Sequence, residues 1–252
     1  RLNNIYLNLL SKVIIINGFG KIVGNNEVEV NGNIIKAKTI LIAVGGKTYF
    51  PRLEGIELCI NSDQALDLKT LPRSIIINGG GYIALEFAGI FASLGSKVTL
   101  VYRGKNILRG FDQDISNFIK EEYIKNNIQV LTETKINSIF KTHKGLSVIL
   151  SDGQEIISNE VMFATGRVPN INGLGLNEIG IKTGDVGEII VDDKNQTNIQ
   201  NIYAIGDVTN RINLTPVAIA EGQVFSDNLF GGMNKICDYE NVASAVFSQP
   251  AI

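Results

Sequence analysis

The segment IINGGGYIALEFAG, Ile76–Gly89, decides the fold. It opens with the apolar residues of a buried strand, turns through three glycines and continues with apolar residues at helical spacing. Gly79, Gly81 and Ala84 occupy the small positions of a G-x-G-x-x-G/A turn. In such turns the first glycine permits the bend, Gly81 with its neighbour Gly80 lets a pyrophosphate approach, and the alanine lets the helix pack closely. Because the helix start offers free N–H groups, the segment predicts a dinucleotide-binding turn rather than a plain strand-to-helix link.

The segments around this turn extend it into a βαβαβ unit with a β-meander, the layout of an α/β dinucleotide-binding domain. Apolar runs predict the strands, and apolar residues every three to four positions predict the helices. We expect strands at 73–78, 97–102 and 128–132, helices at 82–94 and 112–127 with Asp112 or Asp114 near the start of the second, and more strands within 143–166.

The flanking regions are also predicted to mix strands and helices. Before the turn we expect strands at 13–16, 28–30, 34–42 and 39–46, with glycine-rich turns separating the first three. We also expect a short helix capped by Ser62. After it we expect a strand at 201–207 and a helix with Thr215 as N-cap, Pro216 at its first position and Gly231 on its C-terminal side.

Composition excludes several classes of function. The 252 residues are 44% hydrophobic with a net charge of −2, which suits a globular core and gives no electrostatic case for nucleic-acid or anionic-membrane partners. No apolar run reaches the roughly 20 residues of a membrane helix, and no signal peptide is visible. Cys59 and Cys237 form no paired motif and His143 lies in a probable turn, so we expect reduced cysteines, a cytoplasmic location and no metal site.

The end of the second strand predicts the choice of cofactor. An acidic residue there would bind the adenosine ribose and favour NAD. Here the position is Tyr102, followed by Arg103 and, six residues on, by Arg109. Two arginines without a carboxylate suit the 2′-phosphate of NADPH, whereas the alternative is a pair of solvated surface arginines.

Five segments in order resemble one family, the flavoprotein disulfide reductases with two dinucleotide-binding domains, and within it the glutathione reductases. They are GGGYIALEFAGIFASLG, YRGKNILRGFD, ATGRVPN, NIYAIGDVTNRINLTPVAIAEG and VASAVFSQP. The resemblance implies an α/β, FAD/NAD(P)-binding Rossmann-like fold of three ββα layers, with an NADPH domain inserted in a partial FAD domain. It places the FAD domain at 1–46 and 170–238, the NADPH domain at 47–169 and the start of a dimerisation domain at 239–252.

The resemblance also implies roles for residues near the nicotinamide. Tyr82 would be a gate that covers the flavin until the nicotinamide displaces it, although ordinary strand-edge packing is an alternative. Glu86 would lie near the nicotinamide and pair with a lysine of the FAD domain, although it could be a solvated helix charge. Further NADPH contacts are implied for Gly79, Gly80, Gly81, Ile83 and Gly166, and more weakly for Asn213 and Ala245.

On the flavin side, the resemblance implies that Asp207 accepts a hydrogen bond from a ribityl hydroxyl, the alternative being that it caps a turn. Thr215 would present its backbone N–H to the flavin, where a helix opening at Pro216 also directs its positive end. Gly20 and Gly45 resemble backbone positions that line FAD.

Two departures from the family pattern are visible. The redox cysteine pair, the first FAD-binding glycine turn and the catalytic His-Glu pair are absent, so we expect an internal piece with both ends missing, weak FAD binding and no catalysis alone. Gln223 also replaces the usual arginine that grips a substrate carboxylate.

The activity implied by the resemblance runs from NADPH to FAD, to a cysteine pair and to glutathione disulfide, in a homodimer. The alternatives are a non-catalytic NADPH-binding module, or a relative such as trypanothione reductase, lipoamide dehydrogenase or a ferredoxin-type reductase.

Overall fold

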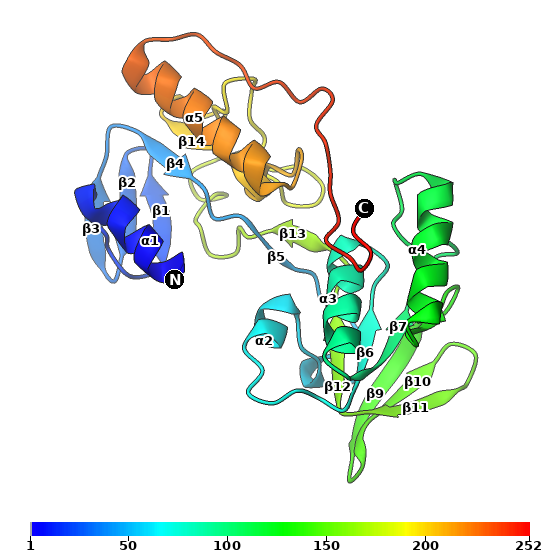
Figure 1. Ribbon diagram of the computed structural model, residues 1–252. Coiled ribbons are helices and arrows are strands. Elements are labelled where there is room, and N and C mark those ends of the chain that lie inside the picture. The colour runs from blue at the N-terminus through cyan, green and yellow to red at the C-terminus, as the bar shows by residue number, and fades with distance from the viewer. Residues whose placement is uncertain (1) are drawn as a thin grey trace. The chain divides into compact units, whose positions relative to one another are not determined.

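The computed structural model describes residues 2–252, with the side chains of residues 2–4 and 7 left undescribed. The chain forms two compact units (Figure 1). Unit 1 comprises Arg1–Lys47 and Val168–Glu240, and unit 2 comprises Thr48–Arg167 and Asn241–Ile252. Unit 2 therefore interrupts unit 1 in the sequence, and the last twelve residues return to unit 2.

Unit 2 is built on a four-stranded parallel sheet with the order β12-β6-β7-β8. The strands are β6 (Ser74–Asn78), β7 (Lys97–Val101), β8 (Gln129–Leu131) and β12 (Glu160–Phe163). The chain runs from β6 towards β7 and β8 and then returns to the other side of β6 as β12. This reversal of strand order beside β6 is the place where open α/β sheets bind ligands.

Side chains alternate between the two faces of this sheet because successive strand residues point in opposite directions. Ile75 and Ile77 pack against the helices α3 (Tyr82–Ser93) and α4 (Gln113–Lys125). Ile76 packs on the other face, against an antiparallel sheet. That sheet consists of β9 (Ile136–Thr142), β10 (Gly145–Leu150) and β11 (Glu155–Ser158).

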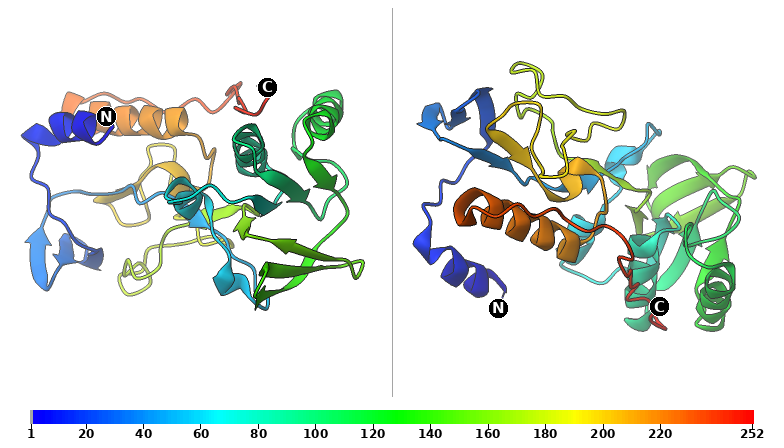
Figure 2. Two further views of the ribbon diagram at one scale, coloured as in Figure 1. Left: turned by 60° about the horizontal axis from the view of Figure 1, so that its bottom comes forward. Right: turned by 90° about the horizontal axis from the view of Figure 1, so that it is seen from above.

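The result is three layers: helices, a parallel sheet and an antiparallel sheet. Figure 2 shows the teal and green helices on one side of the parallel sheet and the green hairpin strands on the other. The predicted ββα arrangement is confirmed. Smaller elements complete the unit, namely the 3₁₀ turn η2 (Ile56–Leu58) and the helix α2 (Ser62–Leu66).

Unit 1 holds an antiparallel sheet, a parallel pair of strands and a long helix. The antiparallel sheet contains β1 (Gly20–Gly24), β2 (Glu27–Val30) and β3 (Asn33–Lys36). The parallel pair is β4 (Ile40–Ile42) with β14 (Ile202–Ala204), and it leads through η3 (Gly206–Thr209) to α5 (Thr215–Gly231). The remaining elements are α1 (Leu2–Leu9), η1 (Leu10–Lys12), β5 (Gly46–Thr48) and β13 (Arg167–Pro169).

Several local predictions were wrong. Residues 13–16 form no strand, whereas the glycine-flanked segment after them is β1 rather than a turn. The expected strand 34–42 divides into β3 and β4, and the helix α1 was not predicted.

Two helix caps also differ from expectation. The N-cap of α2 is Asn61, whose side chain and that of Gln64 form a capping box, so Ser62 is the first helical residue. The N-cap of α5 is Leu214, and Thr215 lies inside the helix with a proline next to it. Of the two aspartates expected near the start of α4, Asp112 is the N-cap, because its side chain accepts hydrogen bonds from the backbone N–H groups of Asp114 and Ile115. Among residues 2–252, no helix is long and apolar enough to cross a bilayer.

Leu100 is fully buried between the parallel sheet and its helices. We expect Leu100→Ala to lower the free energy of unfolding by about 2–5 kcal/mol, because it leaves a cavity in a close-packed layer. Leu94→Ala, at a position that is 62% exposed, is the matched control and should change it by less than about 0.5 kcal/mol. Urea unfolding followed by circular dichroism measures both, and equal losses would contradict the assigned core.

Candidate functional site

The glycine turn between β6 and α3 lies where three strand ends converge. Gly79 donates its backbone N–H to Val101 O at 2.9 Å, which ties the turn to the end of β7. A Cβ atom on Gly79 would lie 2.3 Å from Ala164 O, just after β12, and its φ is +154°. Only glycine fits this position, because any side chain would collide with the backbone of the neighbouring strand.

Gly81 differs from Gly79 because its open side faces no protein atom. Its φ is −89°, and no described atom lies within 4 Å of the point that a Cβ would occupy. It is the N-cap of α3, so the first N–H groups of that helix receive no side-chain acceptor from it. A helix start beside an open glycine fits a phosphate group, which would accept from N–H donors there.

Backbone hydrogen bonds fasten the basic loop after β7 to the glycine turn and to the segment after β8. Leu108 N–H donates to Gly80 O at 2.7 Å, and Glu133 N–H donates to Gly104 O at 3.0 Å. Ile107 and Leu108 are each only 1% exposed, so they anchor the loop in the core. The exposed residues Arg103 and Arg109 therefore lie on a fixed segment beside the turn, rather than on a solvated coil.

Tyr102 occupies the position where an NAD-selecting carboxylate is found in other dinucleotide domains. Its ring lies between two glycine backbones: a Cβ on Gly80 or on Gly104 would come within 2.6 Å of ring carbons. The ring fills this space and offers no carboxylate to a ribose. The arrangement therefore favours a ligand that carries a phosphate near the arginines.

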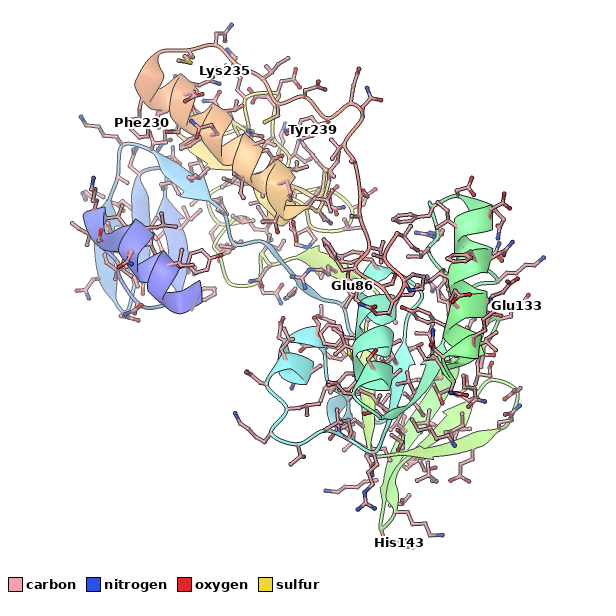
Figure 3. All side chains as sticks on the ribbon, in the orientation of Figure 1. Glu86, Glu133, His143, Phe230, Lys235 and Tyr239 are labelled. Atoms are coloured by element: carbon pink, nitrogen blue, oxygen red, sulfur yellow. The ribbon has the colours of Figure 1, made fainter. Side chains whose placement is uncertain are left out.

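The remaining residues expected in this unit lie around the same sheet edge or along α3. Gly166 follows the end of β12, has a φ of +144° and faces open space among the described residues. Ile83 packs against the helix-side core. Glu86, labelled in Figure 3, lies one turn into α3, and its Oε1 accepts a hydrogen bond from Phe247 N–H at 2.9 Å.

In unit 1, the expected flavin-side residues follow β14. Gly206 has a φ of +73° and packs within 3.2 Å of Ala218 of α5 at the position of a Cβ, so the turn before Asp207 is pressed against the helix. Asp207 is half-buried. Thr215 is exposed at the start of α5, and Gly45 follows β4, the parallel partner of β14.

Two further residues of the expected site contact other parts of unit 1. Gly20 belongs to β1 and pairs with Val30 in the antiparallel sheet. Gln223 donates its side-chain amide to Asp227 Oδ1 at 2.7 Å, so it is held along its own helix. The flavin-side residues are therefore brought together only in part, around the ends of β4 and β14 and the start of α5.

Sequence reasoning missed a buried polar network around Glu221, which is 1% exposed. Its Oε2 accepts from Gly206 N–H at 2.6 Å and its Oε1 accepts from the Tyr239 hydroxyl at 2.7 Å. Arg211 Nη1 donates to the same hydroxyl at 2.6 Å. A signal was present, since Glu221 falls midway between Val217 and Phe225, the buried residues four positions away on either side. A charge on the buried stripe of a helix requires partners.

The cysteines and the histidine behave as the sequence predicts. Both cysteines are free thiols, and His143 lies exposed in a turn at the tip of a hairpin (Figure 3). Burial, followed by the charge of Glu57, raises the pKa of Cys59 to about 12. Within residues 2–252, no group of three or more His, Cys, Asp or Glu side chains could hold a metal ion.

Comparison of the sequence with known protein families agrees with this geometry. Residues 1–222 match the pattern of the pyridine nucleotide-disulphide oxidoreductases. The chain belongs to this family. The residues present fit a dinucleotide, because Gly81 at the start of α3 faces open space among the described residues.

Three relatives illustrate the similarity. The chain is 47% identical to the chloroplastic/mitochondrial glutathione reductase of Pisum sativum, over 100% of this chain and 46% of that protein. It is 42% identical to the trypanothione reductase of Trypanosoma congolense, over 86% of this chain and 45% of that one. The structure is similar to the HOCl-induced flavoprotein disulfide reductase RclA of Escherichia coli, with a TM-score of 0.93 and 29% identity over 99% of this chain and 59% of that chain. The chain thus spans about half the length of the curated relatives it matches.

The two turn glycines should respond differently to a methyl group. We expect Gly79→Ala to destabilise the protein by more than about 2 kcal/mol, because of its positive φ and the contact with Ala164 O. Gly81→Ala should change stability by less than about 0.5 kcal/mol, because its φ is ordinary and the space is open. Thermal unfolding of the two variants, side by side, is the measurement. A severe loss for Gly81→Ala would show that the space is not open.

The raised pKa of Cys59 predicts a slow reaction with electrophiles. At pH 8 a free thiol is about 25% thiolate, whereas a thiol with a pKa of about 12 is only about 0.01% thiolate. We expect iodoacetamide to label Cys59 more than about a hundredfold slower than the same residue in the urea-unfolded chain, with a rate that rises as pH increases. Peptide mass spectrometry resolves it from Cys237, and comparable folded and unfolded rates would refute the burial.

Proposed function

We propose that the protein acts as an NADPH-dependent flavoprotein disulfide reductase and that its disulfide substrate is glutathione disulfide. The observation that carries the proposal is the glycine turn at the start of α3, hydrogen-bonded through Gly80 O to a loop that exposes two arginines. This combination supports recognition of a pyrophosphate and a 2′-phosphate by one site. The names of the relatives support the reductase class.

In this proposal unit 2 binds NADPH. The N–H groups at the start of α3 and the open backbone of Gly81 hold the pyrophosphate, and Arg103 and Arg109 bind the 2′-phosphate. The residues Gly79, Gly80, Ile83 and Gly166 complete the proposed site. Tyr82 acts as the gate over the nicotinamide site, and Glu86 lies near the nicotinamide.

Unit 1 is proposed to bind FAD with Gly20, Gly45, Asp207 and Thr215. NADPH and FAD supply the hydride- and electron-transfer chemistry when they are bound. The contribution of this chain is then to orient them: α5 directs its positive end towards the flavin, and the buried Glu221 holds the turn that carries Asp207. Cys59 does not suit a redox role, because burial keeps its thiol protonated.

Two finer points belong to the same proposal. Glutathione disulfide is favoured over trypanothione disulfide because the glutathione reductase relative is more similar and is matched over the entire chain. Gln223, tied to Asp227, would contact the substrate only weakly. A homodimer in the cytoplasm is proposed for the whole protein. A second function, NADPH binding without catalysis, is favoured by the isolated thiols Cys59 and Cys237.

The test of the cofactor assignment compares two adenosine ligands, 2′,5′-ADP and 5′-AMP, which differ only in the 2′-phosphate. Arg103→Ala should weaken 2′,5′-ADP binding about tenfold or more, because a charge-assisted hydrogen bond is worth roughly 1.5–3 kcal/mol. Binding of 5′-AMP should change by less than about twofold. Isothermal titration calorimetry on the full chain measures both affinities.

Lys105→Ala is the matched control for this test, since it removes another exposed cation from the same loop. We expect it to affect 2′,5′-ADP far less than Arg103→Ala does. If both ligands weaken equally, or if Lys105→Ala costs as much, the arginines act only as general positive charge and the NADPH assignment fails.

A further inference from the structure

Residues 241–252 form a strap that packs against the nucleotide-binding helix of unit 2. Figure 1 shows this segment, in red, beside α3. Val246 is 1% exposed and belongs to the helix-side core, and Ser248 is also 1% exposed. The strap is closed on itself by two backbone hydrogen bonds between Val246 and Ile252, at 2.8 and 3.0 Å. It is therefore a built element of unit 2 rather than a loose tail.

The hydroxyl of Tyr123 joins two helices next to this strap. Tyr123 lies on α4, is fully buried and donates its hydroxyl to Leu85 O of α3 at 2.6 Å. Gln249 of the strap packs in the same place, because a Cβ on Gly89 of α3 would come within 3.6 Å of both the Tyr123 hydroxyl and the Gln249 side chain. Burial, and then the nearby charge of Glu86, raises the pKa of Tyr123. The hydroxyl thus stays protonated and can donate to Leu85 O.

Glu86 is the residue of α3 that the strap holds directly. It follows Leu85, and its Oε1 accepts from the backbone N–H of Phe247 at 2.9 Å. It lies four residues after Tyr82, so both side chains share one face of the helix, next to its N-terminus. Tyr123 therefore supports the backbone on which Glu86 is carried, next to the strap segment that binds the carboxylate.

The topology of the sheet indicates which end of a dinucleotide reaches this face. The pyrophosphate lies at the start of α3, and the arginine loop on the β7 side takes the phosphorylated adenosine. The other half of the ligand must then extend away from β7, towards the β12 side of β6, where Ala164 touches the turn and Gly166 is open. Glu86 lies at this end of α3, and the strap holds its carboxylate.

We propose that the strap and Tyr123 form a positioning device that fixes the Glu86 carboxylate for the nicotinamide half of the cofactor. The inference rests on the proposed binding of NADPH by unit 2. It assigns Tyr123 and the backbone of Phe247 a role in recognition, although neither contacts the ligand. Because Tyr123 and Phe247 act through Glu86, they should affect the binding only of ligands that carry a nicotinamide.

The experiment compares NADP⁺ with 2′,5′-ADP, which lacks the nicotinamide half, by calorimetric titration of the full chain. Tyr123→Phe removes the hydroxyl that donates to Leu85 O. It should weaken NADP⁺ binding roughly threefold to tenfold, as expected for the loss of one hydrogen bond. Binding of 2′,5′-ADP should stay within about twofold.

Ser96→Ala is the matched control, because its buried hydroxyl also donates to a backbone carbonyl, Pro72 O, at 2.6 Å. It should leave the ratio of the two affinities unchanged even where it lowers the unfolding temperature. Glu86→Ala, at a half-buried position, should weaken NADP⁺ selectively. In a double-mutant cycle, the effect of Tyr123→Phe should vanish once Glu86 is removed.

Each result has one meaning. Equal weakening of both ligands by Tyr123→Phe, additive losses in the cycle, or NADP⁺ binding no tighter than 2′,5′-ADP in the unsubstituted chain would overturn the positioning role. Absence of any preference for 2′,5′-ADP over 5′-AMP would instead overturn the proposed NADPH site itself, and the inference with it.

Discussion

The close approach of Gly79 to the backbone after β12 is the constraint on which unit 2 depends. A Cβ at this position would lie 2.3 Å from Ala164 O, so the three strand ends can converge only because this residue has no side chain. The convergence sets the direction in which α3 leaves the sheet. It also brings Gly80 O within reach of the loop that carries the arginines. One steric condition therefore determines both the fold of the unit and the geometry of its candidate site.

In unit 1, a buried carboxylate holds the backbone turn before Asp207 in place. Glu221 is buried in α5 and uses one carboxylate oxygen for Gly206 N–H and the other for Tyr239. Arg211 donates to the same hydroxyl, and its guanidinium carbon lies 5.2 Å from the centre of the Tyr239 ring. Because each partner is satisfied by another, the turn before Asp207 is fixed by a network rather than by a single contact.

Much of unit 2 was predictable because its signals are local. The run Ile75–Ile77 is apolar on both faces, as expected for a buried parallel strand, and Asp112 is a cap next to its own helix. β1 was missed because its bounding glycines, Gly20 and Gly24, indicate a turn when they are considered without their partner strand.

The parts of the site that were not predicted depend on residues far apart in the sequence. The hydrogen bond between Glu86 and Phe247 joins positions 161 residues apart, and no pattern in the sequence of α3 predicts it. Glu221 left a trace as a charge on a buried helical stripe, but its partners became visible only in three dimensions. Which segments meet is determined by packing, so local patterns identify the turn and the arginines but not the groups that hold them in place.

The ring of Tyr102 between the backbones of Gly80 and Gly104 has a consequence for redesign of cofactor preference. The usual strategy would install a carboxylate at position 102 and remove the arginines. Here that exchange would also empty the space between two glycines and loosen the segment that follows β7. Conversely, a side chain at position 80 or 104 is compatible only with a smaller residue at 102. Positions 80, 102 and 104 therefore have to be changed together.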